Sequence, residues 1–329
     1  MKHHHKSMKR PLAGIALCVV TSFASIGQVV AAEHLKWAHI YETDTPMHKW
    51  AVWAADEFKK RTDGRYEIDV FPASSLGTQS QIDEGLTFGT VDIVYTGTQF
   101  AGRQYGPIGI AGAPYIFRDH DHWKAYRDSD LFAELRDGYQ DKTGNIPVAM
   151  TYYGMRHVTA NKPIHSPSDM RDLKIRTPNA PLYMMFPRAV GANVTPIAFS
   201  ELYLALQQGV VDAQENPLHI IRSKRIYEVQ DYINLTGHIT DSLLTIVSGS
   251  IWNDMDEADQ NILKDVLLQA AEQASRDVLK AEEELIAWFR GQGVKVIEVD
   301  RTPFREAVLP SLKAENDWSE ETFQRLNSL

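Results

Sequence analysis

The chain has 329 residues, of which 43% are hydrophobic and 23% charged, and its formal net charge is −9. This composition is ordinary for a soluble globular protein, and the length is sufficient for two lobes with a core each. An acidic chain without a basic block is a poor candidate for binding nucleic acid or an anionic membrane surface, so any anion site must be built from local side chains.

The first 32 residues have the three-part pattern of a secretory signal peptide. Four basic residues and no acid stand within the first ten positions, the apolar run 12–20 follows, and small residues lead to Ala32. We expect residues 1–32 to be removed by cleavage after Ala32. No later apolar stretch reaches the ~18–20 residues that a membrane-spanning helix needs.

The only cysteine, Cys18, lies within this apolar run. The chain after residue 32 therefore has no thiol, which excludes a disulfide, a thiolate metal site and a cysteine nucleophile there. Cys18 could alternatively be a lipid-attachment site, but the bulky Leu17 before it disfavours that interpretation.

Hydrophobic periodicity predicts regularly alternating elements at the start of the exported chain. Strands are expected at 35–40, 66–71 and 91–95, and helices at 46–61 and 78–88. This strand–helix–strand–helix–strand order implies a parallel α/β sheet with right-handed crossover connections.

The middle of the chain continues this alternation, with helices expected at 119–137 and 180–190 and strands at 147–153 and 157–161. The stretch 119–122 reads Asp-His-Asp-His, residue types that suit a divalent metal. Because the four residues are adjacent and open a predicted helix, helix capping and solvated charge explain them better.

The C-terminal part is dominated by helix. Residues 251–290 contain no Gly and no Pro, and apolar residues recur there every three or four positions. This pattern predicts one long helix, or two end to end, packed along one apolar stripe. A strand at 294–299 and a C-terminal helical stretch are expected to follow.

Residues 174–217 contain the strongest indication of a binding site. Arg176 ends one short apolar strand, and Asn216 follows a second predicted strand at 210–213, with a predicted helix at 200–208 between them. A guanidinium and an amide at two strand ends can hold one carboxylate from two sides. Ligands of open α/β sheets bind beyond the carboxyl ends of strands. The segment therefore predicts binding of a small organic anion.

This segment resembles the substrate-binding subunit of tripartite ATP-independent periplasmic (TRAP) transporters. The resemblance is carried by LKIRTPNAP, TPIAFSELYLALQQGVVDAQENP, GMRHVTANKPI, FPASSLG and EGLTFGTVDIVYTG. These motifs occur in the family's order, and the resemblance runs from about residue 35 to the C-terminus.

The resemblance implies a two-lobed α/β periplasmic binding protein fold with parallel-core mixed sheets, a hinge and one long helix bridging the lobes. Lobe I would comprise 33–153 plus 242–280, and lobe II 154–241 plus 281–329. It also implies a periplasmic location, a small organic carboxylate and the TRAP membrane subunits as partners, no cofactor or metal, and a monomer.

Five positions match residues that line the ligand cleft in this family. Arg176 and Asn216 would contact the carboxylate, and Arg156 would contact the ligand directly or through water, with a structural ion pair as the alternative. Phe199 and Asn179 align with cleft positions of sugar-acid-binding relatives, although Phe199 could equally belong to the core.

Residues of the first lobe are expected to hydrogen-bond the ligand's hydroxyl groups. Glu42, Gln79 and Thr98 lie on loops after strands or at a helix start, and a solvated loop carboxylate is the alternative for Glu42. The segment 96–100 lacks the arginine of sialic-acid-binding relatives. This favours uronates or aldonates, while short hydroxy acids and aromatic acids stay open.

Two other functions remain as alternatives. A periplasmic enzyme acting on a sugar acid would need acid–base groups such as Asp212 and Glu215, but no HExxH, GxSxG or phosphate-binding motif accompanies them. A ligand sensor that signals to a membrane receptor would have the same binding site as a transport protein.

Overall fold

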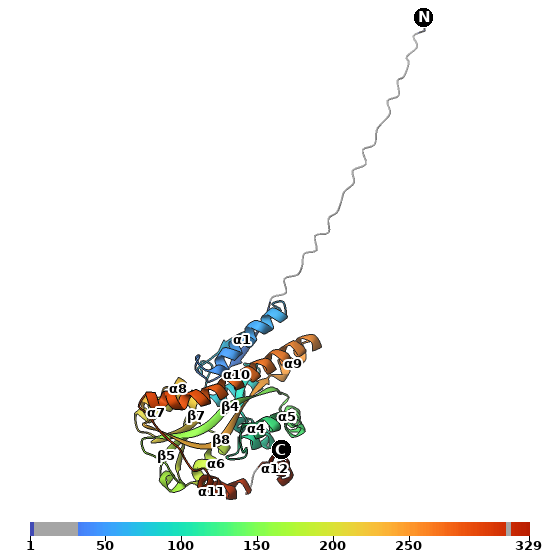
Figure 1. Ribbon diagram of the computed structural model, residues 1–329. Helices are drawn as coiled ribbons and strands as arrows, with labels where there is room; N and C mark the ends of the chain where they lie inside the picture. The colour runs from blue at the N-terminus through green and yellow to red at the C-terminus, as the bar shows by residue number, and fades with distance from the viewer. Residues whose placement is uncertain (3–31, 314–316) are drawn as a thin grey trace. The chain divides into compact units, whose positions relative to one another are not determined.

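The structure is a computed structural model that describes residues 1–2, 32–313 and 317–329. The predicted signal peptide therefore lies almost entirely outside the described residues, and so does Cys18. Residues 32–329 form one compact unit (Figure 1). Among the described residues, no helix combines the length and the apolar character needed to cross a membrane.

The strands form one mixed sheet in the order β2-β1-β3-β8-β4-β7-β5-β6, with β9 paired to β8. Their bounds are β1 (Glu33–Ala38), β2 (Tyr66–Phe71), β3 (Ile93–Gly97), β4 (Ile146–Ala160), β5 (Lys174–Thr177), β6 (Asn193–Pro196), β7 (Ala213–Pro217), β8 (Tyr232–Val247) and β9 (Lys295–Ile297).

The helices cover the sheet and connect its strands. They are α1 (Pro46–Arg61), α2 (Gln79–Thr87), α3 (Thr98–Ala101), α4 (His120–Arg127), α5 (Asp130–Thr143), α6 (Pro181–Ala189), α7 (Leu202–Gln207), α8 (Leu218–Ser223), α9 (Gly249–Asp254), α10 (Glu257–Gly291), α11 (Thr302–Lys313) and α12 (Glu320–Asn327). Four short 3-10 helices add to these: η1 (Gly106–Gly112), η2 (Pro167–Met170), η3 (Phe199–Glu201) and η4 (Ile226–Glu228).

Two parallel three-stranded units occupy the two ends of the sheet. β1 pairs in parallel with β2 and β3, and β5 pairs in parallel with β6 and β7. The parallel arrangement predicted for the N-terminal strands is confirmed. At the centre, β4 and β8 pair antiparallel with each other and with β7 and β3, which makes the sheet mixed.

The two longest strands, β4 and β8, join these units and are buried along almost their whole length. The strands predicted at 147–153 and 157–161 are one continuous strand, β4. A register shift between Tyr152 and Gly154 marks a bulge between the two predicted strands. β8 was not predicted, because buried polar residues such as His238 and Asp241 interrupt its apolar run.

The helix predicted at 251–290 is confirmed as two helices end to end. α9 stops before Asp256, whose side chain caps α10 by accepting a hydrogen bond from the backbone N–H of Asp259. The 35-residue helix α10 contacts α1, β4, α8 and β9. Figure 1 shows it beside α1 and α8. It therefore contacts one helix from each parallel unit, α1 after β1 and α8 after β7, and packs on the central strand β4.

The helix predicted at 119–137 divides into α4 and α5, because Ser129 caps a new helix start. The capping interpretation of 119–122 is confirmed, since Asp119 Oδ1 accepts a hydrogen bond of 2.8 Å from the His122 backbone N–H. Across the described ranges, no cluster of three or more His, Cys, Asp or Glu side chains could hold a metal ion.

Gly154 permits the bulge at the centre of β4, and its replacement tests this constraint. Its φ of +112° is a conformation that favours glycine, and an added Cβ would lie 3.0 Å from Pro217 Cβ and 3.1 Å from Glu282 Oε1. We predict that Gly154→Ala lowers the free energy of unfolding by about 1–3 kcal/mol in urea denaturation. Gly291→Ala, where a Cβ meets nothing within 4 Å and the backbone is helical, is the matched control and should be neutral or raise the free energy of unfolding by up to about 1 kcal/mol.

Candidate functional site

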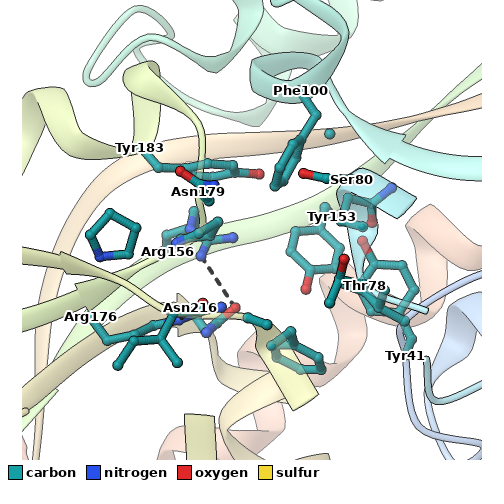
Figure 2. Close-up of a pocket in the computed structure, with 18 residues that line it drawn as sticks. Tyr41, Thr78, Ser80, Phe100, Tyr153, Arg156, Arg176, Asn179, Tyr183 and Asn216 are labelled. Carbon is teal, nitrogen blue, oxygen red and sulfur yellow. Dashed lines mark hydrogen bonds between the residues drawn. The ribbon is translucent and has the colours of Figure 1, made fainter. Parts of the chain in front are cut away.

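A cavity of about 260 Å³ lies where the carboxyl ends of several strands converge. Its walls come from the β1–α1 loop, the start of α2, β4, β5, α6 and β7. Figure 2 shows Arg156, Arg176 and Asn216 on one side of it and Tyr41 and Thr78 on the other. Because pockets for drug-sized ligands measure roughly 300–1,000 Å³, this cavity suits a smaller molecule.

Arg176 is a buried cation without a carboxylate partner. It lies within β5, and its side chain is 1% exposed. Its Nε donates a 2.9 Å hydrogen bond to the Ile197 carbonyl, whereas Nη1 is buried without any hydrogen-bond partner in the described structure. Burial lowers the pKa of Arg176 to about 10, although Glu215 opposes the shift. The site therefore holds a guanidinium that an external anion would stabilise.

Arg156, on β4, differs because the chain itself matches its charge. Its guanidinium forms a two-pronged pair with Glu215, and Nη1 donates to Asp241 Oδ2 at 2.9 Å. Burial opposes its charge, but Glu215 and Asp241 raise the pKa of Arg156 well above its ordinary value. Arg156 thus forms the structural ion pair considered from the sequence, while it also lines the cavity.

The carboxylates around Arg156 are structural groups of the buried network. Burial favours the neutral form of Glu215, yet Arg156 and His238 together lower the pKa of this carboxyl. Burial raises the pKa of Asp241, which also accepts a 2.9 Å hydrogen bond from Gln99 Nε2. Asp212 is exposed while Glu215 is fully buried, so these two do not form the acid–base pair of the enzyme alternative.

Asn216 lies within β7 and is held by hydrogen bonds on both sides of its amide. Its Oδ1 accepts from Arg156 Nη2 at 3.2 Å, and its Nδ2 donates to Gln214 Oε1 at 2.6 Å. Gln214 in turn donates to Thr159 Oγ1 at 3.0 Å. The amide is therefore oriented at the cavity wall by its own strand and by β4 before a ligand arrives.

Three further predicted residues line the cavity. Phe199 is buried, and Asn179 is an exposed residue at the wall. Gln79 also lines it, but its amide nitrogen donates to Asp83 Oδ1 and to the Tyr95 carbonyl, both at 2.9 Å. The Gln79 amide nitrogen is therefore used to hold α2 against β3.

Glu42 and Thr98 do not line the cavity, in contrast to the prediction. Glu42 Oε1 forms a salt bridge of 2.6 Å with Lys224 Nζ. Thr98 is fully buried at the start of α3. Its neighbour Gly97, the last residue of β3, lines the cavity instead.

Sequence reasoning missed the aromatic wall, which consists of Tyr41, Phe100, Tyr153, Tyr183 and Phe199. Of these, only Phe199 was expected in the site. The rings of Tyr41 and Tyr153 lie 5.4 Å apart, and the Tyr183 hydroxyl donates to Asp241 at 3.4 Å. Burial raises the pKa of Tyr41 well above its ordinary value.

Comparison with known proteins identifies the family. Residues 37–317 match the model of bacterial extracellular solute-binding proteins, family 7. The chain belongs to this family of TRAP periplasmic solute-binding proteins. The resemblance seen in the sequence, the two-lobed fold and the periplasmic location are confirmed. This is a family of binding proteins, so the enzyme alternative is excluded.

Similar proteins bind organic acids. A sialic acid-binding periplasmic protein of Vibrio cholerae is 31% identical, over 91% of this chain and 92% of that protein. A solved TRAP solute-binding protein of Polaromonas, bound to D-erythronate, is 32% identical with a TM-score of 0.86, over 90% and 99% of the two chains. One of Roseobacter denitrificans, with bound L-galactonate, is 31% identical with a TM-score of 0.85, over 91% and 99%.

The unpaired guanidinium predicts a trade-off between stability and binding. In the ligand-free protein, Arg176→Met should leave the free energy of unfolding unchanged or raise it by up to about 2 kcal/mol, because it removes a buried unsatisfied donor and an unpaired charge. Thermal unfolding measures this. Arg171→Met, which removes an exposed arginine, controls for net charge. A melting temperature well below that of wild type would show that the Arg176 charge is compensated.

Proposed function

We propose that this protein captures a small hydroxylated monocarboxylate of the uronate or aldonate class and delivers it to the membrane subunits of a TRAP transporter. The observation that carries the proposal is the buried Arg176. Its Nη1 has no hydrogen-bond partner in the described structure, and burial lowers the pKa of its guanidinium. A ligand carboxylate would supply the missing acceptor as a charge-assisted pair.

The other charges around the cavity support a single carboxylate. No acidic side chain lines it among the described residues, and the charge of Arg156 is already matched by Glu215 and Asp241. A ligand ammonium group would therefore have no counter-ion, and a second carboxylate would have no free cation. Asn216 and the Arg156 side chain would support the carboxylate that Arg176 holds.

The opposite wall supports a neutral, hydroxylated remainder of the ligand. Tyr41, Thr78 and Ser80 line that side (Figure 2). Their hydroxyl groups can both donate and accept hydrogen bonds. Phe199 and Tyr153 offer apolar faces to a carbon skeleton. The D-erythronate and L-galactonate found in two relatives about 30% identical are acids of this kind.

The proposed lobes follow the boundaries expected from the sequence, near Tyr153 and Asp241. Support comes from the bulge in the central strand pair, where Gly154 pairs with Asp241. Contacts at the end of the chain favour a different assignment there, because α12 contacts α5 and Arg325 pairs with Glu134 at 2.8 Å. We therefore propose that α12 belongs to lobe I, and that the protein closes around its ligand as a hinge.

Thermal shift with defined acids tests the proposal. We expect D-erythronate, L-galactonate or D-glucuronate at 100 times its Kd to raise the melting temperature by a few degrees, because binding to the native state alone adds about 2.7 kcal/mol. Succinate, amino acids and the matching amides should give no shift. A shift with the amide equal to that with the acid would overturn the role of Arg176.

Arg176→Lys tests the geometry of the contact. A lysine keeps the charge but cannot reproduce the planar two-pronged pair. We predict that the Kd for the best acid, measured by isothermal titration calorimetry, rises about 10- to 100-fold, the loss of one charge-assisted bond of ~1.5–3 kcal/mol. The matched control Arg171→Lys should bind like wild type. Unchanged affinity in Arg176→Lys would show that only a point charge is needed.

A further inference from the structure

An ion pair joins the two sides of the cavity without touching the space inside it. Glu42 lies on the β1–α1 loop and Lys224 ends α8, and Glu42 Oε1 is 2.6 Å from Lys224 Nζ. Among ion pairs of the described residues, this one alone connects segment 33–153 with segment 154–241. Both side chains are partly buried, at 29% and 17% exposed.

Both partners are fixed at their backbones. The Glu42 carbonyl accepts hydrogen bonds from the Thr45 backbone N–H at 3.2 Å and from Thr45 Oγ1 at 2.7 Å, which ties the loop to the start of α1. Lys224 is the C-cap residue of α8, whose first turn continues directly from β7 and Asn216. A contact between two anchored groups loses less entropy than one between free surface side chains.

The same pair is connected to the ligand cavity. Glu42 directly follows Tyr41, which lines the cavity, and Lys224 Nζ lies 5.1 Å from the centroid of the Phe199 ring, which lines it from the other side. The remaining charged neighbours, Arg225 and Glu228, pair with each other. Lys224 is therefore left to bridge Glu42 and the aromatic ring.

We propose that Glu42 and Lys224 form a latch that holds the two lobes closed over the bound acid. The inference rests on the proposed function and adds a control of ligand release to it. Because the latch stabilises the closed form, it slows ligand dissociation without contacting the ligand. The residue that sequence analysis placed against the ligand thus acts through closure. Association, which starts from the open form, should depend on it little.

Dissociation kinetics test the latch. The ligand is the acid that gives the largest thermal shift, and its dissociation rate constant is measured by stopped-flow displacement. This rate constant should rise about two- to five-fold in Glu42→Gln and in Lys224→Met, as expected for the loss of one partly exposed ion pair. The reversed pair, Glu42→Lys with Lys224→Glu, should return to within about twofold of wild type. Glu228→Gln removes a carboxylate from the same surface without breaking the bridge, and it should leave the rate unchanged.

A distance measurement separates failure of the latch from failure of the proposed ligand. Spin labels on cysteines introduced at the exposed positions Asp56 and Gln207 report closure by pulsed electron resonance, with or without ligand. If no acid binds wild type, the proposed function fails, but a smaller closed fraction in Glu42→Gln than in Glu228→Gln still supports the latch. Equal closed fractions, or equal dissociation rates in these two variants, overturn it.

Discussion

The structure depends on burying two guanidinium groups beside one cavity. A buried cation is tolerated when carboxylates match it, and the chain does this for Arg156 with Glu215 and Asp241, from two different strands. Arg176 has no such partner. The two guanidinium groups and the two carboxylates balance in number, but both carboxylates contact Arg156, so the Arg176 guanidinium is buried without a direct counter-charge. A bound carboxylate would supply it.

The architecture explains why the charges meet at this place. Each end of the sheet is a parallel three-stranded unit, and parallel strands direct their carboxyl ends to one edge. Arg176 and Asn216 come from neighbouring strands of one such unit, β5 and β7. The long antiparallel strands β4 and β8 then bring Arg156 and Asp241 to the same edge. The site exists only where the two units and the central pair converge.

The proposed closure and the proposed ligand contacts share this geometry but use different residues. The proposed carboxylate site lies on the side of β5 and β7, whereas hydroxyl groups and the start of α2 face it from the other side. The Glu42–Lys224 pair connects these two sides next to the cavity. Affinity can therefore be adjusted through the closed form as well as through groups that touch the ligand.

The sequence by itself determined the local elements and the chemistry of the site. Helix caps, apolar periodicity and the motifs around Arg176 and Asn216 predicted most strands and helices, the family and the anion site, because these signals are local. Only the tertiary structure decided which arginine lacks a carboxylate partner, that Glu42 pairs with Lys224, and that Tyr41 and Tyr183 line the cavity. Those outcomes depend on residues 58–182 positions apart in the chain, whose contacts no local pattern encodes.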